Sequence, residues 1–370
     1  MRIVFAGGGT SGHINPAIAA AKYIKSRVPD AEILFIGTEN HIEAKLVPQA
    51  GFPIEFIDIR GFKRSLSLYN VGTVRRIFSS RRRCKAIYKQ FKPDIVIGMG
   101  GYISGPTLLA AHKLGIPCLI HEQNARVGMT TKLAAKYASA VMLTFPEAAS
   151  QLPDGTRSVV TGVPIYGDLM KLDKAQCRAE LGFDERPMLL CSGGSLGAKT
   201  INDAMLAYII RHHKEEKLQI VHGTGKIFHA DFMKALEDAG VKTGGSIRVF
   251  EYISEMPKYM TACDAVVCRC GASSLAEMSA AGKPAVVIPF PQATDNHQYY
   301  NAKHLADAGA AILVEDKDYN CKVLEDAAER ILFNEEKRNE MAENLKKAAV
   351  YDFGERVFDC ITSELERAGK

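Results

Sequence analysis

Short apolar runs alternate with amphipathic stretches along the whole chain. Strands are predicted, in chain order, at residues 3–6, 33–36, 54–59, 95–98, 118–121, 140–143, 159–161, 188–191, 219–222, 248–252, 265–268, 285–289 and 311–314. Between most of them lie helical periods, such as residues 17–26, 71–91, 107–114 and 130–137. Strands that are apolar on both sides and separated by helices are typical of parallel sheets covered on both faces. The pattern predicts an α/β fold.

The strand-and-helix pattern restarts after Pro164, so two Rossmann-like domains are expected. The length of 370 residues also exceeds what one hydrophobic core usually supports. A linker is predicted within residues 162–173, and the last helix, residues 354–368, suits either domain. Ligands of such folds bind at the carboxyl ends of the strands, and we expect them in the crevice between the domains.

Each half opens with a glycine-rich strand-to-helix turn. Residues 2–16 read RIVFAGGGTSGHINP, with a helix predicted to begin at Asn15-Pro16, and residues 188–198 read MLLCSGGSLGA. Glycines let backbone N–H groups approach an anion, and a helix N-terminus adds a partial positive charge. The repeated turn indicates phosphate binding more strongly than either copy alone.

Polar residues follow several other predicted strands. Residues 98–106 read GMGGYISGP, residues 121–124 read HEQN, and residues 289–302 read PFPQATDNHQYYNA. Strand ends of one parallel sheet converge on one pocket, so these stretches indicate a site suited to a sugar's hydroxyl groups. In RCGASSLAEM, residues 269–278, Glu277 either interacts with the helix dipole or accepts hydrogen bonds from a ribose.

In this order and spacing, GGGTSGH, GMGGYISGP, HEQN, GGSLGA, CGASSLAE and DNHQYYNA closely resemble the MurG family of glycosyltransferase family 28. These enzymes move N-acetylglucosamine from UDP-N-acetylglucosamine onto a lipid-linked muramyl-pentapeptide in peptidoglycan biosynthesis. The resemblance implies the GT-B fold, an inverting reaction, and neither a catalytic metal nor a cofactor. It also implies an acceptor-binding domain at residues 1–163, a donor-binding domain at 164–351, and a C-terminal helix (about 352–370) on the first domain.

Matching positions imply the site residues. Donor-binding candidates are Thr10, Ser11, Gly12, Asn124, Ser195, Ile253, Ala272, Ser273, Ser274, Leu275, Glu277, His297 and Gln298. Acceptor-side candidates are Gly100, Gly101, Tyr102 and Ser104. One position departs from the family, because Tyr166 stands where an arginine usually contacts a phosphate, and a phenol supplies no guanidinium.

Transfer requires a base for the acceptor hydroxyl and stabilisation of the leaving diphosphate. His13 is the first candidate for the base, since imidazole titrates near neutral pH. Binding of the diphosphate or capping of the helix is an equally open role for His13, and Glu122 is the alternative base.

A basic and apolar segment at residues 61–85 predicts contact with an anionic membrane surface. Its membrane-contact candidates are Arg75, Arg76, Ile77, Phe78, Arg81 and Arg82. The chain has no apolar run long enough to span a bilayer and no signal peptide, and its nine cysteines form no CxxC pair. We therefore expect a peripheral protein on the cytoplasmic face of the membrane, without zinc or nucleic acid; the net charge of +5 alone is too small to indicate nucleic acid.

Other readings predict different chemistry. A glycosyltransferase acting on diacylglycerol would carry similar donor motifs, and a UDP-N-acetylglucosamine 2-epimerase would consume the UDP-sugar without an acceptor. A nucleotide-sugar binding module would need no acceptor-side glycine loop. A Rossmann dehydrogenase is disfavoured, because GGGTSGH lacks the GxGxxG spacing.

Overall fold

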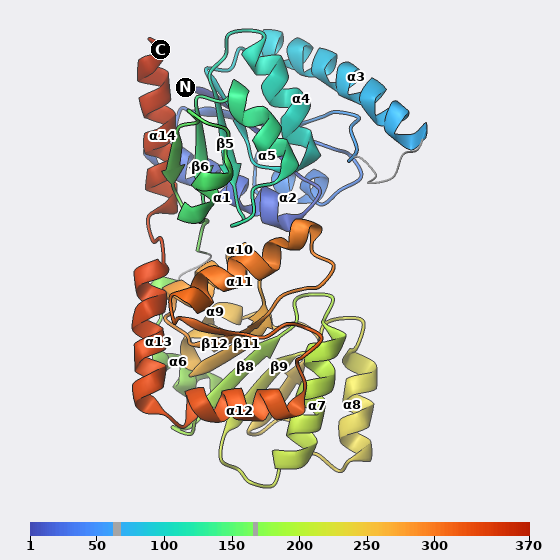
Figure 1. Ribbon diagram of the computed structural model, residues 1–370, viewed down its shortest axis with the longest axis vertical. Coiled ribbons are helices and arrows are strands. Elements are labelled where there is room, and N and C mark those ends of the chain that lie inside the picture. Colours follow the sequence, from blue (N-terminus) through green and yellow to red (C-terminus); the bar gives the residue numbers. More distant parts are fainter. Residues whose placement is uncertain (62–67, 166–168) are drawn as a thin grey trace. The chain divides into compact units, whose positions relative to one another are not determined.

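The computed structural model describes residues 1–61, 68–165 and 169–370, and the chain divides into two compact units (Figure 1). Unit 1 consists of Met1–Pro164 and Val350–Lys370, and unit 2 consists of Ile165–Ala349. The C-terminal segment therefore returns to the unit in which the chain begins.

Unit 1 is built on a parallel sheet of seven strands in the order β3-β2-β1-β4-β5-β6-β7. The strands are β1 (Arg2–Ala6), β2 (Glu32–Gly37), β3 (Ile54–Phe56), β4 (Ile95–Gly98), β5 (Cys118–Glu122), β6 (Ala140–Leu143) and β7 (Ser158–Val160). Alternate residues of β1 enter opposite core clusters, Ile3 and Phe5 on one face and Val4 and Ala6 on the other. This is why the strand is apolar at every position after Arg2.

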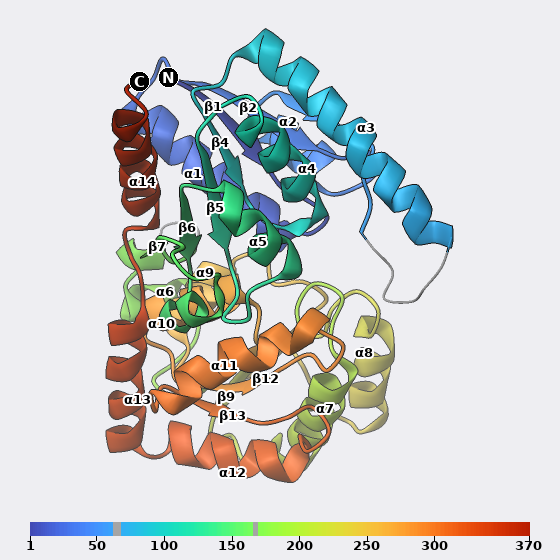
Figure 2. The ribbon, with the colours of Figure 1, turned by 45° about the horizontal axis from the view of Figure 1, so that its top comes forward.

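Helices cover both faces of this sheet (Figures 1 and 2). They are α1 (Ser11–Arg27), α2 (Glu43–Gln49), α3 (Leu68–Phe91), α4 (Gly101–His112), α5 (Met129–Ala134) and α14 (Phe353–Arg367). Helices α1 and α14 contribute to the same core cluster, and α3, α4 and α5 contribute to the cluster on the opposite face. In α14 the residues Phe353, Val357 and Ile361 are buried, which anchors the C-terminal helix on unit 1.

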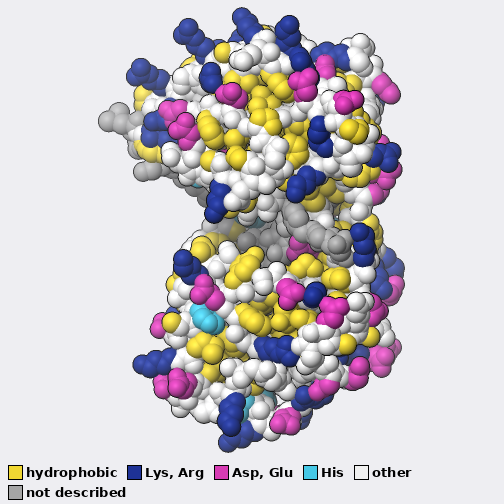
Figure 3. Space-filling view, turned by 180° about the vertical axis from the view of Figure 1, so that it is seen from behind, with side chains coloured by type: hydrophobic (Ala, Val, Ile, Leu, Met, Phe, Trp, Pro, Cys, Tyr) yellow, Lys and Arg dark blue, Asp and Glu magenta, His cyan; other side chains and the backbone are white. Residues whose placement is uncertain are grey.

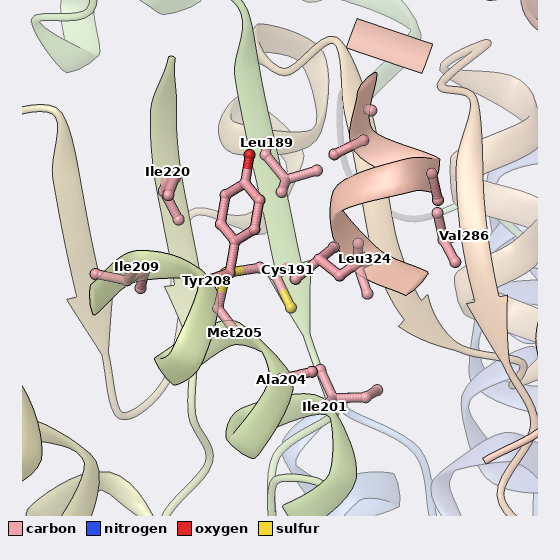
Figure 4. Packing of buried hydrophobic residues seen from close by; sticks show 14 of the residues in the cluster. Leu189, Cys191, Ile201, Ala204, Met205, Tyr208, Ile209, Ile220, Val286 and Leu324 are labelled. Carbon is pink, nitrogen blue, oxygen red and sulfur yellow. The ribbon is translucent and has the colours of Figure 1, made fainter. Parts of the chain in front are cut away.

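Unit 2 repeats the plan with a parallel sheet of six strands in the order β10-β9-β8-β11-β12-β13. The strands are β8 (Met188–Ser192), β9 (Gln219–Gly223), β10 (Ile247–Phe250), β11 (Ala265–Arg269), β12 (Ala285–Ile288) and β13 (Ala311–Leu313). The helices are α6 (Lys174–Leu181), α7 (Lys199–His212), α8 (His229–Asp238), α9 (Met256–Ala262), α10 (Ala272–Ala280), α11 (His297–Asp307), α12 (Cys321–Leu332) and α13 (Glu335–Ala348). Figure 4 shows one core layer, in which Leu189 and Cys191 of β8 lie against Met205 and Tyr208 of α7. The predicted α/β class with two Rossmann-like parallel sheets is confirmed.

Two helices begin earlier than the sequence predicted. The prediction that α1 begins at Asn15-Pro16 is wrong, because Thr10 is the N-cap and Ser11 to His13 form the first turn. Pro16 lies inside the helix, where its missing N–H removes one hydrogen bond near the N-terminus. The predicted helix at 107–114 likewise begins at Gly101, so the YISG motif belongs to the first turns of α4.

Two predicted strands extend two or three residues beyond the ends of those observed. β3 ends at Phe56 rather than at residue 59, and Ile57 and Ile59 are apolar because they pack in the core beyond the strand. β10 ends at Phe250, and Tyr252 beyond it is 67% exposed. In both cases the predicted strand includes residues that lie beyond the hydrogen-bonded part of the sheet.

Candidate functional site

Each sheet has one point where the strand order reverses. In unit 1 the order reverses between β1 and β4, and in unit 2 it reverses between β8 and β11. The loops after these neighbouring strands diverge to opposite faces and leave a crevice at the carboxyl ends, which is the usual ligand site of such sheets. The turns GGGTSGH, GMGGYISGP, GGSLGA and CGASSLAE each lie at the end of one of these four strands.

Unit 2 contains a cavity of about 370 Å³ at this place. Its walls come from the ends of β8, β9 and β11, from the loops after β8 and β10, from α9 and α10, and from Leu169. The lining residues are Leu169, Ser192, Gly194, Ser195, Gly223, Glu251, Tyr252, Ile253, Ser254, Met256, Pro257, Met260, Cys268, Arg269, Ser274 and Glu277. Four donor-binding candidates from the sequence are among them, namely Ser195, Ile253, Ser274 and Glu277.

The loop of residues 193–198 is held against the loop after β9 by close backbone contact. A Cβ on Gly197, which has φ +86°, would lie 2.1 Å from the Thr224 carbonyl oxygen. The Lys226 N–H donates to the Ser195 carbonyl at 3.2 Å. Only glycine permits this approach, so the GGSLG motif fixes Ser195 at the cavity wall.

The cavity contains a carboxyl group and a guanidinium group in different surroundings. Burial raises the pKa of Glu277 to about 7. Arg269, at the end of β11, lies 2.5 Å from the Asp316 carboxylate (Nη1 to Oδ1) and also donates to the Pro289 carbonyl at 3.0 Å. Arg269 is the one Lys or Arg among the described residues that line the cavity.

The other donor candidates of unit 2 lie outside the cavity lining. Ala272 and Ser273 form the first turn of α10, and Leu275 is buried in the core. His297 begins α11, and its Nδ1 lies 2.8 Å from the Thr294 carbonyl oxygen. Gln298 Oε1 accepts from the N–H groups of Cys270 at 3.2 Å and Phe290 at 2.9 Å. Gln298 therefore joins the loops after β11 and β12.

Sequence reasoning missed most of the segment after β10. Residues 251–257 supply six lining residues, of which only Ile253 was a candidate. Glu251, Tyr252 and Ser254 come after β10 in the structure, whereas the predicted strand of residues 248–252 included the first two. Polar side chains at the end of a strand are the signal that could have identified them. Arg269, the last residue of β11, was not a candidate, although a charged residue at the end of an apolar strand is the same kind of signal.

In unit 1 the loop of residues 7–10 uses two of its N–H groups internally. Gly7 N–H donates to the Ile36 carbonyl at 3.3 Å, and Gly9 N–H donates to Glu43 Oε2 at 2.9 Å. The candidates Thr10, Ser11 and Gly12 lie at the N-terminus of α1, Thr10 as the N-cap and the other two in the first turn, and all three are exposed. Anion binding in this loop would therefore depend on the N-terminus of α1 rather than on Gly7 or Gly9.

His13 lies in the first turn of α1, half-buried beside the loop after β4. Its Nδ1 lies 3.1 Å from the Gly8 carbonyl oxygen and 3.1 Å from Thr10 Oγ1. A carbonyl oxygen only accepts hydrogen bonds, so Nδ1 carries the proton and the neutral ring has its lone pair on Nε2. A Cβ on Gly100, which has φ +95°, would lie 2.6 Å from the His13 Cδ2. Glycine at this position therefore leaves room for the imidazole ring.

The HEQN motif forms a buried network rather than a solvated loop. His121 Nε2 donates to the Gly162 carbonyl at 2.8 Å, and His121 Nδ1 lies 2.9 Å from Gln123 Nε2. Burial lowers the pKa of His121 to about 4. Glu122 is 5% exposed, and its carboxylate accepts from the N–H groups of Gly128 at 3.0 Å and Asn124 at 3.2 Å. The candidate Asn124 is half-buried beside Glu122.

The acceptor-side candidates occupy the first turns of α4. Gly101 has φ +71°, and a Cβ at this position would lie 3.0 Å from the Gly8 carbonyl oxygen. Ser104 is buried, accepts from Gly100 N–H at 3.0 Å and donates to the Ala6 carbonyl, so its hydroxyl joins α4 to β1. Tyr102 OH lies 3.0 Å from His41 Nε2. Of these residues, Tyr102 presents a partly exposed polar group beside the loop of residues 7–10.

Helix α3 lies beside α4 (Figure 2). It carries an outward stripe of exposed apolar and basic residues. Val71, Val74 and Phe78 are 66%, 44% and 60% exposed, and Arg75 and Arg82 are exposed on the same helix. Arg81 lies over the Phe78 ring, whereas Arg76 pairs with Asp58. Ile77 instead packs against the core. The rest of the predicted segment, residues 62–67, and Tyr166 lie outside the described residues.

Membrane-spanning helices and metal sites are both absent from the described part of the chain. Within residues 1–61, 68–165 and 169–370, no helix combines the length and apolar character needed to cross a bilayer. In the same ranges, no three His, Cys, Asp or Glu side chains gather as a metal site requires.

Each of the two doubly wound units has glycine-rich loops at its switch point, as nucleotide-binding folds do. The family models agree, since residues 3–143 match the glycosyltransferase family 28 N-terminal domain and residues 188–357 match the family's C-terminal domain. The chain belongs to glycosyltransferase family 28.

Curated relatives share the full length of the chain. A protein of Acetivibrio thermocellus is 39% identical over 362 residues, covering 98% of this chain and 97% of the relative. A Bacillus licheniformis protein is 40% identical over 371 residues, covering 100% of each chain. Both are named UDP-N-acetylglucosamine–N-acetylmuramyl-(pentapeptide) pyrophosphoryl-undecaprenol N-acetylglucosamine transferase.

Solved structures share the fold. The crystal structure of Acinetobacter baumannii MurG matches with a TM-score of 0.79 at 30% identity, covering 98% of this chain and 99% of the other. A putative UDP-N-acetylglucosamine 2-epimerase of Listeria monocytogenes matches with a TM-score of 0.68 at 14% identity, covering 99% of this chain and 97% of the other. The second likeness concerns the fold alone.

The raised pKa of Glu277 predicts a pH-dependent stability. Between the ordinary glutamate pKa of 4.5 and the folded value of about 7, the folded state binds more protons at this group than the unfolded state. Stability from this group is therefore lost as the pH rises through that window, by about 3 kcal/mol at most. Urea unfolding at pH 5 and pH 8 should show Glu277→Gln gaining stability relative to the unsubstituted protein at the higher pH. An equal difference between the two proteins at both pH values would contradict the assignment.

Proposed function

We propose that this chain transfers N-acetylglucosamine from UDP-N-acetylglucosamine to the muramyl sugar of the lipid-linked muramyl-pentapeptide, with inversion at the anomeric carbon. The observation that carries the proposal is the cavity at the β8/β11 switch point, with Glu277 and Ser195 in its wall, in a chain 39–40% identical to transferases named for this reaction. Unit 2 is assigned to the donor and unit 1 to the acceptor.

The polarity of the cavity in unit 2 suits UDP. Ser195 lies in the cavity wall just before α7, so a diphosphate there would gain hydroxyl and backbone N–H donors. Glu277, once ionised, accepts hydrogen bonds from the two ribose hydroxyls. Among the described residues that line this cavity, Arg269 is the cation that could meet the diphosphate. It would take the role of the family's phosphate-contacting arginine, at whose position this chain has Tyr166.

His13 is assigned as the general base. Its Nε2 removes the proton of the attacking hydroxyl while the oxygen forms its bond to the anomeric carbon and UDP leaves with the bonding electron pair. Glu122 suits this role less well, because burial and backbone N–H donors fix its carboxylate inside unit 1. Its hydrogen bonds to Asn124 and Gly128 instead shape the loop that carries Asn124.

The outward stripe of α3 is assigned to an anionic membrane surface, which places the enzyme peripherally at the cytoplasmic face. Apolar side chains flanked by arginines insert at the headgroup boundary while the guanidinium groups meet anionic lipid. Met129 and Leu133 of α5, 67% and 60% exposed, add apolar side chains on a helix that contacts α4 on the same sheet face (Figures 1 and 2).

A transfer assay tests the function as a whole. UDP-N-acetylglucosamine is supplied with or without a short-chain analogue of the lipid-linked muramyl-pentapeptide. UDP release and a disaccharide product are expected only when the acceptor is present. Conversion of the UDP-sugar without an acceptor would identify an epimerase, and release with diacylglycerol alone would identify the other transferase reaction.

Removal of the base should slow turnover without weakening donor binding. His13→Ala is expected to reduce kcat by about 10²- to 10⁴-fold, with the dissociation constant of UDP unchanged because the cavity lies in unit 2. Steady-state kinetics and calorimetric titration of UDP measure the two quantities. A nearly unchanged kcat with weaker acceptor binding would assign His13 to binding rather than to proton transfer.

Charge reversal on α3 should weaken membrane association. Each exposed basic residue contributes about 1 kcal/mol near an anionic surface, so Arg75→Glu with Arg82→Glu is expected to reduce binding to phosphatidylglycerol vesicles at low salt by at least about tenfold. The matched control is Lys217→Glu with Lys242→Glu, two exposed lysines of unit 2. Unit 2 has cationic and anionic side chains interspersed on the face seen in Figure 3. Equal vesicle binding by the two double variants would contradict the assignment.

A further inference from the structure

A fully buried carboxylate lies behind the loop of residues 7–10. Glu43 begins α2, and its side chain is 0% exposed. Its Oε1 accepts from the Thr38 hydroxyl at 2.6 Å and from the Thr38 N–H at 3.1 Å, and its Oε2 accepts from the Gly9 N–H at 2.9 Å. These three donors are neutral groups, so they solvate the carboxylate without cancelling its charge.

Two glycines make room for this carboxylate. A Cβ on Gly8 would lie 2.4 Å from Glu43 Cδ, and a Cβ on Gly37 would lie 2.7 Å from Glu43 Cγ. Real side-chain atoms do not approach so closely, so the loops after β1 and β2 can close on Glu43 only with glycine at both positions. The placement of Glu43 is therefore built into the GGG motif and the end of β2.

The same loop connects Glu43 to His13 through a single peptide group. The N–H of that group, from Gly9, donates to Glu43 Oε2 at 2.9 Å. Its carbonyl, from Gly8, accepts from His13 Nδ1 at 3.1 Å. The peptide bond is a resonance system, so a negative charge at its N–H end increases electron density at its oxygen. Hydrogen bonds linked in this way strengthen one another, most of all in a buried setting.

We propose that Glu43 is a positioning residue for His13 and acts on it through the Gly8–Gly9 peptide. The polarised carbonyl holds the imidazole proton on Nδ1, so the basic nitrogen of the neutral ring is Nε2, the atom assigned to take the hydroxyl proton. When Nε2 takes the hydroxyl proton, the positive charge of the ring is stabilised by the carboxylate at the far end of the chain of hydrogen bonds. The proposal rests on the proposed role of His13 as base.

Other polar groups near His13 and Glu43 do not supply this charge. Thr10 Oγ1 also contacts Nδ1 but is neutral, and Gln123 approaches the same glycine, Gly100, from the HEQN network as a neutral amide. His121 interacts with His13 electrostatically, and with a pKa of about 4 it is neutral near pH 7. Tyr102, hydrogen-bonded to His41, has its pKa raised first by burial and then by Glu43. Of these groups, Glu43 carries the negative charge that faces the peptide.

Nitrogen-15 NMR of the full chain with labelled histidines tests the proposal directly. The signals of His13, among the ten histidines, are assigned by their loss in His13→Gln. The unsubstituted protein should show neutral His13 protonated on Nδ1. In Glu43→Gln the titration midpoint of His13 is expected to fall by about 0.5 to 1 pH unit, with a smaller share of the Nδ1-protonated form. The acid limb of the kcat/KM profile should move in the same direction by a similar amount.

Glu364→Gln is the matched control. Glu364 is also a buried carboxylate of unit 1, paired with Arg157 on the α14 side of the sheet, and has no link to the Gly8–Gly9 peptide among the described contacts. This control should leave the titration midpoint of His13 in place, and UDP affinity should be unchanged in both variants. A midpoint that does not move in folded Glu43→Gln, or that moves as far in Glu364→Gln, would overturn the proposal.

The unsubstituted protein provides a test that does not depend on a variant folding. If neutral His13 carries its proton on Nε2, Nδ1 cannot donate a hydrogen bond to the Gly8 carbonyl, and the proposal is wrong. If the NMR results are as expected but His13→Ala turns over normally, the coupling to Glu43 stands and the assignment of His13 as base fails.

Discussion

The reversal of strand order in each parallel sheet is the constraint on which the rest of the structure depends. Parallel strands place all their carboxyl ends on one edge, and the loops after β1 and β4, or β8 and β11, diverge there. Hydrophobic burial of both sheet faces by helices makes this edge rigid, since the central strands have apolar residues in two core clusters. The crevice follows from the topology, and the loop residues decide what it binds.

The two switch points are alike in backbone and different in chemistry. In unit 2 the glycines of the β8 loop allow tight contact between loops, and the cavity beside them is lined by serines, a buried carboxyl group and an arginine. In unit 1 the glycines of the β1 loop close around Glu43 and bring His13 against the β4 loop. One glycine-rich device therefore forms part of a cavity wall in one unit and places an ionisable group in the other.

The strand pattern, the two Rossmann-like sheets and the glycine-rich turns could be predicted from the sequence, because each depends on local apolar runs and on φ angles that favour glycine. Glu277 could also be predicted from the sequence, as a carboxylate just after a small-residue turn. Glu43 could not be predicted, because a glutamate in the first turn of a short helix is usually a solvated residue interacting with the helix dipole. Its burial depends on Gly8 and Gly37, which lie far apart in sequence. The predicted start of α1 was wrong for a different reason. Proline is favoured in the first turn of a helix, so Pro16 indicated a later start than the true N-cap, Thr10.

We assign the nucleotide to the switch point of unit 2 and the base to unit 1. Hydrogen–deuterium exchange with and without UDP tests this division. Slower exchange with UDP is expected in the backbone amides of residues 193–198, 251–257 and 269–277, with the loops at residues 7–13 and 99–104 unchanged or less affected. Protection concentrated in those unit 1 loops, without protection around the cavity of unit 2, would contradict the assignment.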